Sequence, residues 1–217
     1  FIQADLFNAS NTKWDDTAEA LLAETMVDVE EGSLRGPFTP KEITSRMGPL
    51  WTAARRFAIV QKEKLRPIDD YLASGLNSTF GTSEKASLKG VDQIVSWARA
   101  WAHSPDEGYA TFHVTDGKTR RVPLHAGWKE DEWTNVMGRV TNLKKAYKQL
   151  AASHTDKCFS LIALKGKGGE TLLFEALSLM FGATAAVYLF LRFSRALAAL
   201  GTFWLRLVLV EFFDDFT

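Results

Sequence analysis

The chain has 217 residues, of which 46% are hydrophobic, so it can bury the core of one large domain or two small ones. Its single cysteine, Cys158, excludes an internal disulfide framework and fits a reducing compartment such as the cytoplasm or nucleus. The net charge of zero hides an asymmetry. Residues 1–31 hold eight acidic residues and one basic residue, so the rest carries seven excess positive charges, which suit a polyanionic partner or an ordinary solvated surface.

The N-terminal segment is predicted to be mostly helical. Residues 15–32 place apolar side chains at helical spacing, and Gly32 is a usual helix end. Residues 35–42 are rich in turn formers, and Pro40 is expected near the start of a second, short helix. With the acidic charge of this segment, these patterns indicate an acidic helical extension.

Residues 55–71 predict a β-hairpin. Two strand-like runs flank a charged turn at 61–64. Because proline cannot donate to a β-ladder, Pro67 restricts the second strand to a sheet edge or interrupts it. Residues 83–102 follow as a predicted helix with its apolar residues on one face, although Gly90 weakens the helical pattern.

The next part of the chain is predicted to alternate strands, turns and helices. The polar stretch 103–135 contains TDGK at 115–118, which marks a hairpin. Residues 138–153 indicate a strand running into a short helix, and residues 159–179 indicate two strands joined by a Gly/Lys turn. Residues 182–200 predict a long helix.

The C-terminal quarter of the sequence is strongly apolar and allows two interpretations. In the first, residues 203–213 form a strand that leads to two aspartates. In the second, residues 171–191 and 196–213 form a membrane hairpin, since about 20 apolar residues of helix cross a bilayer. Glu175 and Arg206 argue against the hairpin, because a charge near the centre of a span costs about 2.5–3.5 kcal/mol.

Several well-known catalytic and metal-binding patterns are missing from the sequence. The Gly/Lys segment LKGKGGE at 164–170 lacks the G-x-x-x-x-G-K-[ST] pattern of a phosphate-binding loop. The four histidines lack metal-ligand spacing, and one cysteine cannot build a cysteine-rich zinc site. There is no G-x-S-x-G nucleophile elbow. These chemistries therefore have no support in the motifs.

Two adjacent carboxylates, Asp214 and Asp215, follow the last apolar run in the segment FFDD. A buried carboxylate is unfavourable unless it is paired or holds a metal, so the pair is either a solvated acidic segment or part of a metal site. Nucleotidyl transfer uses two divalent ions about 3.5–4 Å apart, and Mg²⁺ prefers carboxylate and phosphate oxygens. A tight turn carrying two carboxylates suits that chemistry.

Three further segments precede FFDD: KEKLRPIDDY (62–71), VTNLKKAYKQL (140–150) and LMFGATAAVYLFLRFSRAL (179–197). In order and spacing, the four segments resemble the fingers and palm of a reverse transcriptase, the RNA-directed DNA polymerase of a retroelement, of the dinoflagellate type. The resemblance implies an α+β fold, a partial right-hand polymerase with an antiparallel palm sheet, packed helices and no thumb. It divides the chain into an acidic helical extension, 1–47, and a partial fingers–palm domain, 48–217, that stops just after the Asp-Asp motif.

The resemblance implies a catalytic metal site of three residues. FFDD is similar to the family's aromatic-x-Asp-Asp turn, so Asp214 and Asp215 would hold two Mg²⁺ ions, or Mn²⁺. TNLKKAY is similar to the second metal-binding strand, and Asn142 stands there at the family's Asp position. Because an amide offers a carbonyl oxygen but no charge, we expect weak Mg²⁺ binding and little polymerisation.

The resemblance also implies a set of substrate-binding residues. Arg66 would grip the incoming triphosphate with Lys64 nearby, since guanidinium groups bind phosphate through paired donors. Tyr147 matches the aromatic residue that packs under the sugar and excludes a 2′-hydroxyl. Phe181 and Gly182 match the loop that packs on the new base pair.

The implied function is RNA-directed DNA polymerisation, with an RNA or DNA template, a primer and deoxynucleoside triphosphates as partners and no membrane. The chain begins at Phe1 and stops soon after the aspartates, so we expect a fragment without the thumb or other polyprotein parts. Two alternatives stay open. One is a decayed, non-catalytic copy that at most binds nucleic acid, and the other is an integral membrane protein with a C-terminal apolar hairpin.

Overall fold

The computed structural model describes residues 15–82, 85–86, 88–102, 109–113, 116–123, 138–205, 207 and 209–216. These residues form an α+β fold in two compact units. The first unit comprises the described residues up to 85 and residues 144–191, and the second comprises those of 86–143 and from 192 onward. The expectations for residues 1–14, for most of 103–135 and for Arg206 fall outside the described residues.

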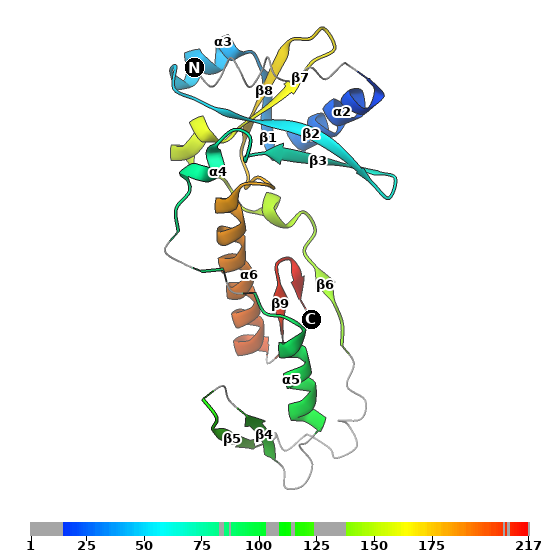
Figure 1. The fold of residues 1–217 in the computed structure, drawn as a ribbon, viewed down its shortest axis with the longest axis vertical. Coiled ribbons are helices and arrows are strands. Elements are labelled where there is room, and N and C mark those ends of the chain that lie inside the picture. Colours follow the sequence, from blue (N-terminus) through cyan, green and yellow to red (C-terminus); the bar gives the residue numbers. More distant parts are fainter. Residues whose placement is uncertain are drawn as a thin grey trace. The chain divides into compact units, whose positions relative to one another are not determined.

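A five-stranded sheet forms the centre of the first unit (Figure 1). In spatial order its strands are β1 (Leu34–Phe38), β8 (Thr171–Ala176), β7 (Leu161–Lys165), β2 (Ala53–Gln61) and β3 (Lys64–Asp70). Neighbouring strands are antiparallel except β2 and β7, which run parallel. The sheet is therefore mixed and not purely antiparallel. The two strands predicted within 159–179 are confirmed as β7 and β8.

Helix α2 (Asp16–Glu30) confirms the helix predicted over residues 15–32. It begins where the Asp15 carboxylate accepts a hydrogen bond of 2.8 Å from the Ala18 N–H, which satisfies a backbone donor that the helix itself leaves unpaired. The chain leaves the helix at Gly32, whose φ of 76° lies in the left-handed region that glycine enters without strain.

The prediction of a link over residues 35–42 is wrong in part, because residues 34–38 form strand β1 and pair with β8. The turn formers within this strand coincide with a shift of register between Arg35 and Phe38, which an edge strand tolerates. Helix α3 (Pro40–Met47) follows as predicted. It opens with a capping box, in which Thr39 and Glu42 each accept a hydrogen bond from the other's backbone N–H.

The hairpin predicted over residues 55–71 is confirmed by β2 and β3. Its turn consists of Lys62 and Glu63, which both have positive φ, as the tight hairpin turns require. Pro67 pairs with Ala58 on β3, and β3 is an edge strand of the sheet. The edge position explains why a proline is accommodated inside a strand.

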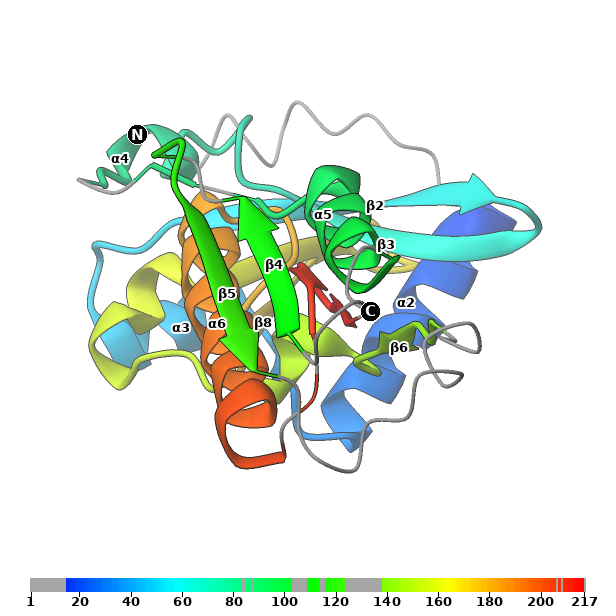
Figure 2. The same cartoon turned by 90° about the horizontal axis from the view of Figure 1, so that it is seen from below.

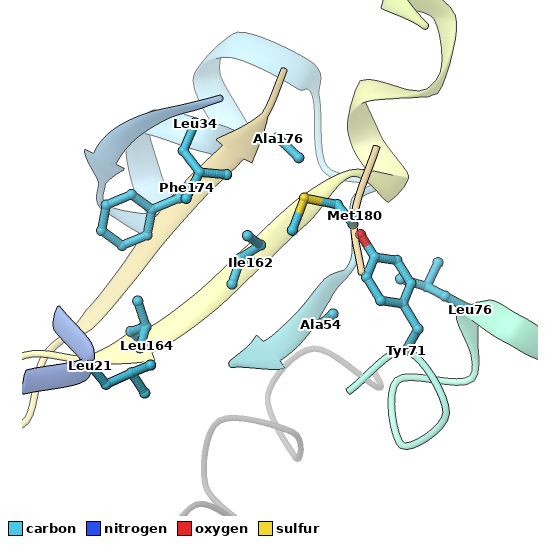
Figure 3. Packing of buried hydrophobic residues seen from close by; sticks show 10 residues of the cluster. All are labelled: Leu21, Leu34, Ala54, Tyr71, Leu76, Ile162, Leu164, Phe174, Ala176 and Met180. Carbon is cyan, nitrogen blue, oxygen red and sulfur yellow. The ribbon is translucent and has the colours of Figure 1, made fainter. Parts of the chain in front are cut away.

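The sheet of the first unit is packed on both faces. One face of the sheet, helix α2, the start of α4 (Leu76–Thr79) and residues that follow β3 and β8 contribute the cluster shown in Figure 3. Its members are Leu21, Leu34, Ala54, Tyr71, Leu76, Ile162, Leu164, Phe174, Ala176 and Met180. The second cluster includes Ile43 of α3 and consists of Ile43, Trp51, Ala53, Leu161, Ala163 and Leu173. Alternating residues of β7 and β8 enter different clusters, as the two-residue period of a strand requires.

A buried charge cluster ties α2 to the hairpin of the first unit. The Arg56 guanidinium donates to both carboxylate oxygens of Asp69, at 2.7 and 3.1 Å, and to Asp28 on α2 at 3.1 Å. Lys148 also pairs with Asp28, so two cations balance two carboxylates. Burial raises the pKa of the Asp69 carboxyl above its usual range, while Arg56 acts in the opposite direction. Because every charge has a partner, the cluster can stay buried.

The second unit contains helix α5 (Val91–Ala102) and two small antiparallel sheets. One is the hairpin of β4 (Tyr109–His113) and β5 (Thr119–Pro123), side by side in Figure 2, which confirms a hairpin in the 103–135 stretch. The helix predicted over 83–102 starts late. The described residues before Gly90 are not helical, because glycine favours a helix boundary over a helix interior.

The other small sheet has the spatial order β6 (Thr141–Asn142), β10 (Asp215–Phe216) and β9 (Glu211–Phe212). The strand predicted over 203–213 is wrong except at residues 211–212, because helix α6 (Thr184–Leu205) continues past the expected end at residue 200 and residues 207, 209 and 210 belong to neither a helix nor a strand. The other helices of the described residues are short: α4 (Leu76–Thr79) and the 3₁₀ turns η2 (Ala146–Gln149) and η3 (His154–Phe159).

Candidate functional site

The aspartate pair lies on a tight hairpin in the second unit. Strands β9 and β10 pair through Phe212 with Asp215 and Glu211 with Phe216, which leaves Phe213 and Asp214 as the turn. Phe216 on β10 and Glu211 on β9 are buried, whereas Asp214 and Asp215 remain half-buried at the turn. The hairpin therefore presents two consecutive carboxylates at one end of a small sheet.

The backbone of the turn is strained, and a hydrogen bond from helix α6 fixes it. Phe213 has a φ of 55°, a left-handed conformation that is unfavourable for a bulky residue. Its carbonyl oxygen accepts a hydrogen bond of 2.6 Å from the hydroxyl of Ser194, a fully buried residue of α6. Strain of this kind persists where the surroundings fix the backbone, and it gathers at functional sites. Ser194 was not predicted from the sequence, where it reads only as one polar residue in an apolar helix.

Asn142 lies beside the aspartate pair, on a neighbouring strand of the same small sheet. Strand β6 pairs with β10 through Asn142 with Asp215, and the Leu143 N–H donates to the Asp214 carbonyl oxygen at 2.9 Å. The ladder thus fixes Asn142 against the turn. All three residues belong to the second unit.

The Asn142 amide bridges the two carboxylates. Its Nδ2 donates to Asp214 Oδ2 at 3.1 Å and to Asp215 Oδ1 at 2.8 Å. The reverse orientation would put a third acceptor oxygen against two carboxylates, so the hydrogen-bond network determines which way the amide points. To offer its carbonyl oxygen to a metal, Asn142 must rotate and give up both hydrogen bonds.

The described residues contain no group of three or more Asp, Glu, His or Cys side chains that could hold a metal. Glu211 is the nearest carboxylate in sequence, but it is buried and pairs with Lys89 at 2.9 Å, beside a pocket of about 680 Å³. The site therefore offers two carboxylates and one amide. These groups fit a divalent cation, with one negative charge fewer than three carboxylates would supply.

The predicted phosphate-binding residues lie in the first unit, on the β2–β3 hairpin. Arg66 and Lys64 are both exposed on β3. Neither forms an ion pair within the part of the chain that the structure describes, although Arg55 on β2 pairs with Asp70 at 3.3 Å. Both cations are therefore available to an anion from solvent.

Tyr147 and Phe181, two of the residues named by the resemblance, contact each other in the first unit. Their rings meet edge to face with centroids 5.7 Å apart, and Tyr147 also packs on Phe190 of α6 at 4.7 Å. Phe181 remains 59% exposed. The cluster gives one partly exposed aromatic surface at the start of α6, which can accept a flat apolar ring.

Gly182 adjoins this aromatic surface and is held by a residue that sequence reasoning missed. The Asn77 side chain donates to the Gly182 carbonyl oxygen at 3.0 Å and accepts from the Thr184 N–H at 2.8 Å. It thereby satisfies a backbone donor in the first turn of α6, as a cap from a distant segment. The only sequence signal is an asparagine just after the Arg66 strand, in the segment SGLN.

Replacing Gly182 with alanine is expected to destabilise the chain by about 1–3 kcal/mol, the range for a strained backbone position. Its φ is 106°, and a Cβ there would lie 2.4 Å from the Asp69 carbonyl oxygen. Urea unfolding would measure the loss. Gly81→Ala is the matched control, because a Cβ at Gly81 meets nothing within 4 Å. Equal stability of the two variants would contradict the close packing at Gly182.

Helix α6 is, in the described part of the chain, the one helix long and apolar enough to cross a membrane. One such helix is weak evidence, since core helices of soluble proteins pass the same test. The predicted alternative of a membrane hairpin required a second spanning helix. Residues 171–176 form strand β8 instead, and the run 196–213 is divided between α6 and β9.

The predicted site residues thus fall into two groups. Asn142, Asp214 and Asp215 form one in the second unit, and Arg66, Lys64, Tyr147, Phe181 and Gly182 belong to the first. No family model matches the chain, and a search of the curated proteins found no match.

Proposed function

We propose that this chain is the fingers–palm part of an RNA-directed DNA polymerase of the reverse-transcriptase type. The observation that carries the proposal is the contact of Asn142 with both Asp214 and Asp215, at 3.1 and 2.8 Å. These residues come from segments 72 and 73 positions apart, and the motif resemblance relates the same three positions. An acidic pair without a shared site would not be expected to contact the strand that contains Asn142.

In the proposed reaction, divalent ions bound by the carboxylates would stabilise the attacking and leaving oxygens of phosphodiester formation. The chain's own part is to fix the carboxylates on a rigid turn, through Ser194 and the β6–β10 ladder. Arg66 and Lys64 would bind the triphosphate of the incoming nucleotide. The aromatic surface of Tyr147 and Phe181 would pack against its sugar and base.

A second candidate function is nucleic-acid binding without catalysis, by a decayed copy of the same domain. The Asn142 amide favours it, because two hydrogen bonds already stabilise the carboxylates without a metal. The site then has a lower charge and a filled hydrogen-bond network. Template and primer would still bind the exposed cations of the first unit, Lys64 and Arg66.

Single-nucleotide incorporation into a labelled template–primer in Mn²⁺ tests the function. For this assay, a thumb domain from an active polymerase is fused after Thr217 to hold the duplex. We expect Asn142→Asp to incorporate at least about 10²-fold faster than the natural form, since even one lost transition-state donor slows enzymes by about 10²–10³. Adding Asp215→Asn should abolish incorporation. Equal rates with and without Asp215→Asn would overturn the proposed role of the carboxylates.

A further inference from the structure

Glu175 is a fully buried carboxylate in the middle of the sheet of the first unit. It lies on β8 between β1 and β7, where its direct neighbours in the ladders are Arg35 and Leu161. It shares a face with Leu173, two residues earlier, and so points to the side of the sheet covered by α3. A carboxylate at such a position needs a cation, because isolated charge is unfavourable in an apolar core.

Three cations meet this one carboxylate, from three different elements. Arg46 of α3 approaches Glu175 Oε2 to 3.3 Å and Arg35 of β1 to 3.6 Å, while Lys157 of η3 approaches Oε1 to 3.2 Å. One negative charge thus faces three positive charges. The cations keep 35–50% of their side chains exposed, so the excess charge lies at the surface.

The cluster around Glu175 differs from the other buried charge cluster of the same unit. Around Arg56, two cations balance two carboxylates, and Arg56, Asp28 and Asp69 are all buried. The Glu175 cluster has two cations more than its carboxylate requires. One of its arginines is also oriented: the Arg46 guanidinium lies over the Phe38 ring, 4.5 Å from its centroid. A stacked guanidinium loses little freedom when a ligand binds, so its outer N–H groups are prepared for an anion.

We propose that Arg35, Arg46 and Lys157 form a phosphate-binding surface, oriented by Glu175, that binds the phosphodiester backbone of a nucleic-acid strand. Guanidinium donors match phosphate oxygens in pairs, and an ammonium adds a point charge. Arg35 and Arg46 approach the same oxygen of Glu175 and Lys157 approaches the other, so the three charged groups converge and can bind neighbouring phosphate oxygens of a strand together. This surface belongs to the first unit, whereas the aspartates belong to the second, so its binding does not depend on the proposed catalysis.

Fluorescence anisotropy with a labelled single-stranded oligonucleotide tests the surface on the full chain. We expect Arg35→Gln, Arg46→Gln and Lys157→Gln each to weaken binding about three- to tenfold and to reduce the salt slope by about 0.7. Arg55→Gln is the matched control: it removes the same charge at similar exposure, but Arg55 is neutralised one to one by Asp70. That variant should bind within about twofold of the natural chain.

Two further arms keep the test decisive. Arg46→Lys keeps the charge and replaces Arg46→Gln if that variant unfolds, and it should lose part of the affinity. Competition by inorganic phosphate separates a small-anion site from a strand site. Equal losses in the triad and Arg55 variants, or displacement of the oligonucleotide by equimolar phosphate, would overturn the proposal.

Discussion

Replacing Asn142 with aspartate is expected to tighten Mn²⁺ and Mg²⁺ binding about 10–100-fold, a change that even outer-shell partners of a metal can produce. The substitution adds a third negative charge beside Asp214 and Asp215, and it removes the two amide hydrogen bonds that now occupy them. Charge interactions near a protein surface are worth several kcal/mol, about 4 kcal/mol at 4 Å, so one added carboxylate matters.

Calorimetric titration with Mn²⁺ would measure this change. Asn142→Ala is the control, because it removes the same hydrogen bonds without adding charge, and it should leave metal affinity within a few-fold of the natural form. Without metal, the aspartate variant should unfold at a lower temperature than the natural chain, since three carboxylates repel one another. Added Mn²⁺ should reverse that loss. If the natural and aspartate forms bind Mn²⁺ equally, position 142 is not a metal ligand.

Replacing Arg56 with methionine is expected to destabilise the chain by about 3–5 kcal/mol, the effect of removing one partner from a buried ion pair. Asp69 would lose both of its hydrogen-bonded contacts with Arg56, while Asp28 would keep only Lys148. A loss of this size is a large share of the stability of a typical domain. We therefore expect the contact between α2 and the β2–β3 hairpin to be the first that the variant loses during unfolding.

Urea unfolding would measure this loss, with Arg55→Met as the control. Arg55 is the neighbouring residue on the same strand, and its pair with Asp70 is 45% exposed on the arginine side. An exposed pair contributes about 0–1 kcal/mol, so the control should change little. Adding Asp28→Asn and Asp69→Leu, which leaves only the partly exposed Lys148 of the cluster charged, should recover part of the stability. Similar losses in the Arg55 and Arg56 variants would show that burial does not govern these pairs.

Local patterns predicted the elements whose limits are set by local chemistry. The hairpin of β2 and β3 is fixed by its charged turn and by Pro67, and α2 by Asp15 and Gly32. Patterns failed where one residue type suits two structures. The apolar run from Phe203 fits a helix as well as a strand, so the end of α6 could not be predicted.

The candidate site was predictable only in part, and for a physical reason. Asn142 and the aspartate pair could be related by their motifs, whereas the groups that hold them come from distant segments without a motif. Ser194 reaches the turn across 19 residues, and elsewhere in the fold Arg46 reaches Glu175 across 129. Contacts of that kind depend on how elements pack, which no local pattern records.

Amide NMR of the ¹⁵N-labelled natural chain during Mn²⁺ addition tests the central claim most directly, because a bound paramagnetic ion broadens the signals nearest to it even when binding is weak. If Asn142, Asp214 and Asp215 form one metal site, the amide signals of residues 141–143 and 214–216 should broaden first and together, along with the Asn142 side-chain NH₂ signal. Asp214→Asn with Asp215→Asn should prevent it. Broadening that begins at the acidic first turn of α2, or that persists in the double variant, would contradict a metal site at this turn.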